Sequence, residues 1–177
     1  MSVAKAAASN RSAVAAATNL VDLVLAQGSI PRTVAARHKV AGAWKDVTWG
    51  EILERTRRLS EGLLGLGLAP GDKVAIFAST RLDWCIGDFA VMGAGATAVP
   101  IYDSNTAAET EYIINNSGAR MVILDHDTGK APGSGRWSRL LSVKEKLPTV
   151  IAFVAMDLPS DPALRLRSEE RRVGKEC

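Results

Sequence analysis

The sequence is poor in cysteine, histidine and aromatic residues. Its 177 residues include two cysteines, Cys85 and Cys177, two histidines, and only 5% phenylalanine, tryptophan and tyrosine. Two cysteines so far apart make no disulfide framework and, with so few histidines, no zinc site. His38 and His126 alone cannot supply a credible Ser/His/Asp or Cys/His arrangement. These absences exclude a disulfide-stapled secreted domain and favour a reducing, cytoplasmic setting.

Long apolar runs and long basic runs are missing as well. No segment approaches the ~20 consecutive apolar residues that a membrane-spanning helix needs. The 22 lysines and arginines face 19 acidic residues, a net charge of +3, and they form no run that would track a phosphate backbone. We therefore expect no transmembrane segment and no nucleic-acid partner. The 47% hydrophobic and 23% charged fractions are ordinary for a soluble globular domain.

Both ends differ in composition from the middle. Residues 1–17 are rich in alanine and serine and bury little apolar surface, so we expect a flexible or transiently helical tail. This segment contains lysine and arginine, and no acidic residue precedes Asp22. An organellar targeting segment is therefore an open alternative. Residues 161–177 are expected to be unstructured. Within them, 167–177 has seven charged residues of eleven and is similar to one reading frame of a sequencing-library adapter. We interpret that string as non-native, with a natural charged tail as the alternative.

Between the tails, residues 18–160 alternate between helical and strand spacing of apolar side chains. Helices are expected within 18–27, 48–66, 82–92, 106–117 and 137–146, and buried strands within 74–77, 96–101, 121–124 and 150–154. Two β-prone runs, 33–38 and 44–49, flank a glycine-containing turn and predict a hairpin.

Two helix starts carry a capping box, in which a threonine and a glutamate three residues later satisfy each other's backbone N–H groups. The pairs are Thr48 with Glu51 and Thr106 with Glu109, and Gly118 is a natural helix stop. The apolar faces expected to follow comprise Ile52, Thr56, Leu59, Leu63 and Leu66 in the first helix and Tyr112 and Ile113 in the second.

Near-continuous apolar strands separated by amphipathic helices predict a parallel sheet that is covered on both faces, with right-handed crossovers. The fold class is therefore α/β, with parallel βαβ units and a small peripheral β-hairpin.

Two glycine-rich segments imitate phosphate-binding motifs. Gly93, Gly95 and Ala98 match the letters of a dinucleotide fingerprint, but they close a helix and enter a strand, whereas the motif must open a helix. We interpret them as close packing of helix and sheet. Residues 128–130 (TGK) with 133–135 (GSG) lack the order of a phosphate loop, so we interpret the segment as a surface loop.

Other chemistry-bearing residues are also interpreted as structural. Residues 125–127 (DHD) offer three metal-ligand types in a row, but neighbours on a strand point to opposite faces and no distant cluster completes a site. A solvated strand end is expected there. Cys85 shares an apolar helical face with its neighbours, which predicts a packed, unreactive thiol. Trp84 and Trp137 are expected to anchor packing.

Several of these segments, taken in order, resemble the opening of the AMP-forming adenylating enzymes. They are 47–49 (VTW) leading into 51–53 (EIL), then 70–76 (PGDKVAI), 92–96 (MGAGA) and 99–102 (VPIY). The stretch from Tyr102 through 111–119 (EYIINNSGA) is most similar to the long-chain fatty acyl-CoA synthetase branch. The resemblance covers about residues 18–156, and its specificity lies in the order and spacing of the pieces.

This resemblance implies a two-step reaction in a parent enzyme. A carboxylate attacks the α-phosphate of ATP to give acyl-AMP and pyrophosphate, and coenzyme A then displaces AMP to give a thioester. Mg²⁺ and clamping donors would spread the developing phosphoryl charge. In that family the phosphate loop, the nucleotide contacts and the catalytic lysine lie downstream of this region, so no catalytic, cofactor-binding or metal residue is assigned. The chain is expected to be an amino-terminal fragment with an incomplete sheet, a scaffold that binds no cofactor and is inactive alone.

Two alternatives stay open. The chain could be a stand-alone α/β binding or interaction module, or it could belong to another adenylating branch that activates amino acids or shorter acids. For the parent enzyme, the resemblance implies a fatty acid substrate and leaves open both peripheral membrane association and a homodimer. The identity of the acid is not encoded here, since the pocket that selects it lies downstream in the family.

Overall fold

The computed structural model describes residues 3–126 and 134–156. Residues 128–133 of the phosphate-loop-like segment and the tail expected at 161–177 lie outside the described residues, and those expectations remain predictions.

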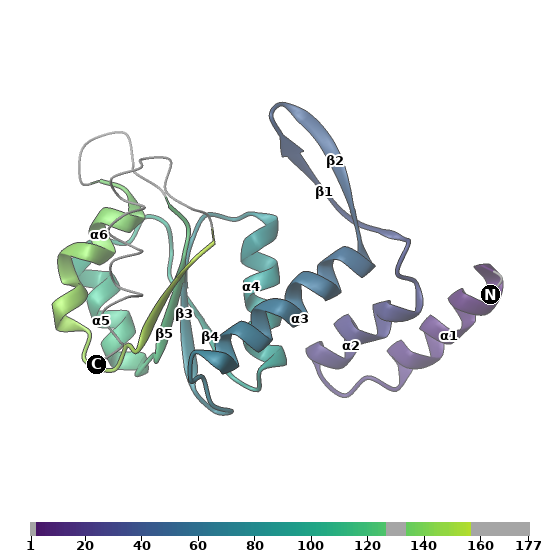
Figure 1. The fold of residues 1–177 in the computed structure, drawn as a ribbon, viewed down its shortest axis with the longest axis horizontal. Helices are drawn as coiled ribbons and strands as arrows, with labels where there is room; N and C mark the ends of the chain where they lie inside the picture. The colour runs from purple at the N-terminus through teal and green to yellow at the C-terminus, as the bar shows by residue number, and fades with distance from the viewer. Residues whose placement is uncertain (1–2, 127–133, 157–177) are drawn as a thin grey trace.

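A four-stranded parallel sheet forms the centre of the described structure (Figure 1). Its strands lie in the order β4-β3-β5-β6 and comprise β3 (Lys73–Phe77), β4 (Thr97–Pro100), β5 (Met121–Leu124) and β6 (Ala152–Ala155). Every neighbouring pair is parallel, so each connection crosses over the sheet. The crossovers are α4 (Leu82–Gly93), α5 (Ala107–Ser117), and α6 (Arg136–Val143) followed by the short turn η2 (Lys144–Lys146). The expected α/β class is confirmed.

Alternate residues of the central strands face opposite layers of helices. One core cluster joins β3 and β5 to α5 and α6 and includes Ala75, Phe77, Val122, Leu124, Ile114 and Leu140. The other joins the same strands to α4 and to the preceding helix α3 (Trp49–Gly65) and includes Val74, Met121, Ile123, Leu63, Ala90 and Val91. No residue from Val74 to Phe77 or from Met121 to Leu124 is more than 1% exposed. Burial on both faces explains the continuous apolar runs.

Helix α3 connects the sheet to the amino-terminal elements and packs along α4 (Figure 1). Its predicted capping box is confirmed, with the Thr48 side chain accepting from the Glu51 N–H and the Glu51 side chain accepting in return. The hydroxyl of Ser60 donates to the carbonyl of Ala90 at 2.8 Å. A Cβ at Gly93 would lie 3.2 Å from that hydroxyl, so this glycine permits close packing of α4 against helix α3, and not against the sheet as we predicted.

The predicted hairpin is confirmed as β1 (Val34–Val40) and β2 (Ala43–Thr48), which pair antiparallel. It projects from the molecule beside α3 (Figure 1).

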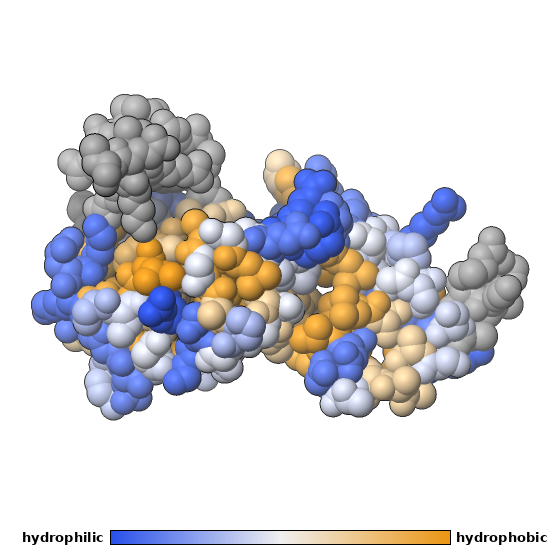
Figure 2. Space-filling model, turned by 60° about the horizontal axis from the view of Figure 1, so that its bottom comes forward, coloured by the Kyte–Doolittle hydropathy of each residue, from blue (hydrophilic) through white to orange (hydrophobic). Residues whose placement is uncertain are grey.

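The amino-terminal residues are helical, and the expectation of a flexible or transiently helical tail at residues 1–17 remains a prediction. They contain α1 (Val3–Ala15), which is followed by α2 (Leu20–Ala26) and the turn η1 (Gln27–Ser29). The side-chain amide of Asn10 donates to the carbonyl of Ala26 at 3.0 Å, so α1 gains a polar contact that alanine content alone does not suggest. Apolar side chains remain on the surface of α2, where Leu20, Leu23 and Leu25 are exposed (Figure 2).

Two residues expected on apolar faces are instead exposed. Leu66 lies one residue beyond the end of α3 and is 54% exposed, and Tyr112 is 68% exposed. In α5 the buried positions are Thr110 and Ile114, so the face that meets the sheet is rotated from the one we predicted.

The second capping box provides a test of the helix starts. Thr106 accepts a hydrogen bond from the N–H of Glu109, and the glutamate side chain accepts from the N–H of Thr106 at 2.7 Å. Thr106→Ala is expected to lower the free energy of unfolding by about 1 kcal/mol, because loss of the threonine hydroxyl leaves the N–H of Glu109 without its acceptor. Urea denaturation measures this, and Thr33→Ala, at an exposed threonine outside any helix start, is the control. Equal effects of the two substitutions would contradict the role of the cap.

Candidate functional site

The carboxyl ends of the parallel strands bring polar residues to one edge of the sheet. Ser79 follows β3, Asp103 follows β4 and Asp125 follows β5. From β3 the chain goes first to β4 on one side and then back to β5 on the other, so the strand order reverses between β3 and β5. Open α/β sheets bind ligands in the crevice at such a reversal. The carboxyl edge between β3 and β5 is therefore the candidate site.

Asp125 is the centre of this edge. Its carboxylate accepts from the hydroxyl of Ser79 at 2.7 Å and from the backbone N–H of Ser79 at 3.0 Å. On its other side, Nε and Nη2 of Arg136 donate to the two carboxylate oxygens at 2.6 and 3.0 Å. This is the forked pairing that a planar guanidinium makes with a carboxylate. Both side chains are buried, with exposed fractions of 4% and 8%.

Two arginines of α6 connect this carboxylate to the loop after β4. Nη1 of Arg136 donates to the carboxylate of Asp103. Arg139, one turn further along α6, donates to the backbone carbonyls of Asn105 and Asp103, the latter at 2.9 Å. Its guanidinium also lies over the ring of Phe77, 5.2 Å from the centroid. The loops after β3 and β4, the end of β5 and the start of α6 are therefore held together by one polar cluster.

The electrostatics of the cluster favour an ionised Asp125. Burial acts to raise the pKa of this carboxyl, but the hydrogen bonds from Arg136 and Ser79 and the charge of Arg136 outweigh it, so the pKa lies below its ordinary value. A carboxylate with a depressed pKa is a weak base. Ser79 donates its proton to a group already bound by arginine, so this arrangement orders the strand ends and does not activate a nucleophile.

This result corrects the prediction of a solvated strand end at residues 125–127. Asp125 is 3% exposed and belongs to a buried ion pair. The partner lies eleven residues later on α6, a tertiary contact that the spacing of the three residues does not reveal. Asp127 lies outside the described residues. Within 3–126 and 134–156, no group of three potential metal ligands comes together.

Cys85 also departs from its prediction, because it is exposed and not packed. Helix α4 buries Ile86, Gly87, Ala90 and Val91, and Cys85 lies one residue away from this stripe, turned by about 100° around the helix. The thiol is nonetheless not activated. Partial burial raises its pKa, and the nearby carboxylate of Asp88 raises it further.

The remaining residues singled out in the sequence do not assemble a second site. Trp137 packs against the core cluster beneath α5 and α6, and its ring lies 5.5 Å from that of His126. Trp84 is half-buried on α4. His38 lies on β1, far along the chain from both. Across the described ranges, no helix is long and apolar enough to span a bilayer.

The fold is thus a doubly wound α/β unit. At its carboxyl edge between β3 and β5, the polar side chains are bound to one another by ion pairs and hydrogen bonds. A family model described as AMP-binding enzyme matches residues 27–175. The chain belongs to this family of AMP-binding enzymes.

Individual proteins resemble the chain in sequence or in fold. The long-chain-fatty-acid–CoA ligase FadD15 of Mycobacterium bovis is 36% identical over 98 residues, 55% of this chain and 16% of that protein. A solved fatty acyl CoA synthetase of Mycobacterium tuberculosis gives a TM-score of 0.64 at 23% identity, covering 85% of this chain and 28% of that one. The anthranilate CoA ligase AuaEII, solved with anthranoyl-AMP, gives 0.56 at 22% identity, covering 63% and 20%. The chain therefore spans less than a third of each of these three proteins.

The buried ion pair predicts a large and pH-dependent stability effect. Asp125→Asn leaves Arg136 buried without its forked partner and is expected to cost about 3–5 kcal/mol of unfolding free energy. The matched control is Asp46→Asn, which breaks the exposed pair with Arg37 and is expected to cost at most about 1 kcal/mol.

The sign of the pH dependence follows from the depressed pKa of Asp125. The stabilisation is present above the unfolded pKa of about 3.9 and is lost as the pH falls through the lower folded pKa. The difference between the original chain and Asp125→Asn should therefore narrow at acidic pH. Urea denaturation across pH measures it, and a difference that persists below both pKa values would contradict this assignment.

Cys85 is expected to react slowly although it is exposed. Because its pKa is raised, the folded chain should be alkylated at Cys85 more slowly than the urea-unfolded chain at the same pH. Asp88→Asn removes the nearby charge and should speed the reaction, whereas Asp46→Asn should not. Mass spectrometry of the Cys85 peptide follows the rate. Alkylation in the folded chain as fast as in the unfolded chain would refute this expectation.

Proposed function

We propose that this chain is part of an AMP-forming ligase that converts a long-chain fatty acid into its coenzyme A thioester. The observation that carries the proposal is the 36% identity to FadD15 over 98 residues, together with the match of residues 27–175 to the AMP-binding enzyme family. The reaction would consume ATP, form acyl-AMP with release of pyrophosphate, and transfer the acyl group to coenzyme A. The use of nucleotide is supported by the related anthranilate CoA ligase AuaEII, which was solved with anthranoyl-AMP.

Within such an enzyme, the residues described here serve as a scaffold. Mg²⁺ would need carboxylates that are free to bind it, but the carboxylate of Asp125 is bound by Arg136 and Ser79. The cluster instead fixes the strand ends and the loop around Asp103 and Asn105. A fixed carboxyl edge gives the neighbouring parts of an enzyme a rigid surface on which to place substrate. We also propose a cytoplasmic location and a subdomain boundary near residues 18 and 160.

A second branch of the family is the alternative that the comparisons favour most. The anthranilate ligase shares the fold at 22% identity, which leaves the acid undetermined. Translation of the complete reading frame that contains this chain, followed by assays with palmitate and with anthranilate, separates the two. We expect ATP-dependent palmitoyl-CoA formation. Activation of anthranilate alone would assign another branch, and no pyrophosphate release with any acid would favour a binding module.

The chain of 177 residues is itself expected to be inactive. It should form no acyl-CoA from palmitate, ATP, Mg²⁺ and coenzyme A, because the described residues supply no phosphate loop and no cluster of three potential metal ligands. Pyrophosphate release is the readout, with a preparation from cells carrying the empty vector as the control. Release above that control would contradict the scaffold role.

A further inference from the structure

The tip of the β1–β2 hairpin is an apolar surface that the fold does not bury. Residues 40–44 (VAGAW) are all exposed, and Trp44 is 66% exposed. The hairpin extends away from the sheet and its helices, so its tip is the part of the hairpin furthest from the protein body (Figure 1). A projecting large aromatic residue next to valine and alanine costs solubility unless something covers it.

The turn at the tip contains alanine at a position whose backbone conformation favours a polar residue or glycine. Ala41 and Gly42 both have positive φ, 49° and 84°, which is the geometry of a two-residue hairpin turn. Asparagine, aspartate or glycine adopts this conformation more readily than alanine does. Among the described residues, Ala41 is the one non-glycine residue with positive φ. The sequence thus keeps the tip free of polar side chains at a conformational cost.

Cations surround this apolar tip. The ammonium of Lys39 lies 5.2 Å from the centroid of the Trp44 ring, its cross-strand neighbour. Lys45 is exposed on the adjacent position, and Arg37 pairs with Asp46 at 2.6 Å. The two strands therefore carry three basic side chains near the tip and one carboxylate, that of Asp46.

We propose that this hairpin tip binds the surface of an anionic phospholipid bilayer. Trp44 would lie at the level of the headgroups, where tryptophan is favoured because its ring is apolar and its N–H is polar. Val40, Ala41 and Ala43 would enter the boundary between headgroups and acyl chains, and Lys39 and Lys45 would meet lipid phosphates. The exposed lysines beside the apolar tip match the anionic charge of such a surface. The proposal does not depend on the ligase activity.

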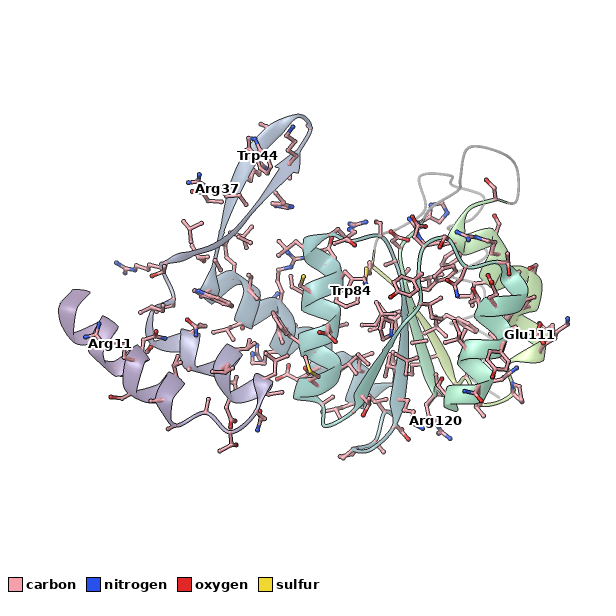
Figure 3. All side chains as sticks on the ribbon, turned by 180° about the vertical axis from the view of Figure 1, so that it is seen from behind. Arg11, Arg37, Trp44, Trp84, Glu111 and Arg120 are labelled. Atoms are coloured by element: carbon pink, nitrogen blue, oxygen red, sulfur yellow. The ribbon has the colours of Figure 1, made fainter. Side chains whose placement is uncertain are left out.

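Vesicle sedimentation of the full chain tests the charge requirement. We expect binding to vesicles of phosphatidylcholine with phosphatidylglycerol, weaker binding to phosphatidylcholine alone, and loss at high salt. The double variant Lys39→Gln with Lys45→Gln should bind about 25-fold more weakly, since each cation contributes about fivefold. The matched control is Arg120→Gln with Lys146→Gln; Arg120 lies at the opposite end of the molecule from Trp44 (Figure 3). Equal loss in both double variants, or no preference for the anionic vesicles, would overturn the proposal.

Tryptophan fluorescence tests the position of the tip independently. Vesicles of brominated lipid should quench the original chain and the Trp84→Phe variant but not Trp44→Phe, because only Trp44 would reach the bilayer. Far-ultraviolet circular dichroism verifies that each variant is folded. Quenching that survives in Trp44→Phe would place another surface at the membrane, and absence of quenching in the original chain would favour a protein partner for the hairpin. Either outcome would overturn the proposal.

Discussion

The two-sided burial of strands β3 and β5 is the constraint on which the rest of this structure depends. Because no residue of Val74–Phe77 or Met121–Leu124 is more than 1% exposed, each strand needs a helical layer above and below it. Parallel pairing then requires a crossover through those layers, which determines where α4, α5 and α6 run. The same pairing aligns the carboxyl ends, so the polar residues that follow the strands meet at one edge. Fold and candidate site thus have one physical origin.

Much of this fold was predictable because its signals are local. The capping boxes at Thr48 and Thr106 involve residues three apart, and both form as expected. The hairpin and the four parallel strands also follow from short runs of apolar or β-prone residues, although β4 and β6 are only partly buried, whereas we expected all four strands to be buried. Helix faces were less predictable. Tyr112 satisfies the apolar pattern of α5, yet it is exposed because α6 and the sheet meet the turn that carries Thr110 and Ile114.

The candidate site was not predictable, because it depends on contacts between distant residues. From the sequence alone Asp125 is expected to be exposed to solvent, since it follows the predicted strand 121–124 and lies two residues before Asp127. Only the return of the chain through α6 brings Arg136 within 2.6 Å of its carboxylate. Ser79 gave no signal either, being one serine in a loop after β3. The sequence places Arg136 near the start of a helix. No fixed sequence spacing relates the start of that helix to a carboxylate at the end of a preceding strand, so the ion pair could not be predicted.

The two edges of the sheet differ in how they resist further pairing. Strand β4 ends in Pro100, which has no N–H to donate, and its first residue is an exposed threonine. Strand β6, Ala152–Ala155, contains only alanine, phenylalanine and valine, without proline or charge. Among the described residues it pairs only with β5, so its outer row of backbone groups has no strand beside it. Edges of this kind readily accept another strand. The β6 edge is therefore the side on which a larger sheet can grow.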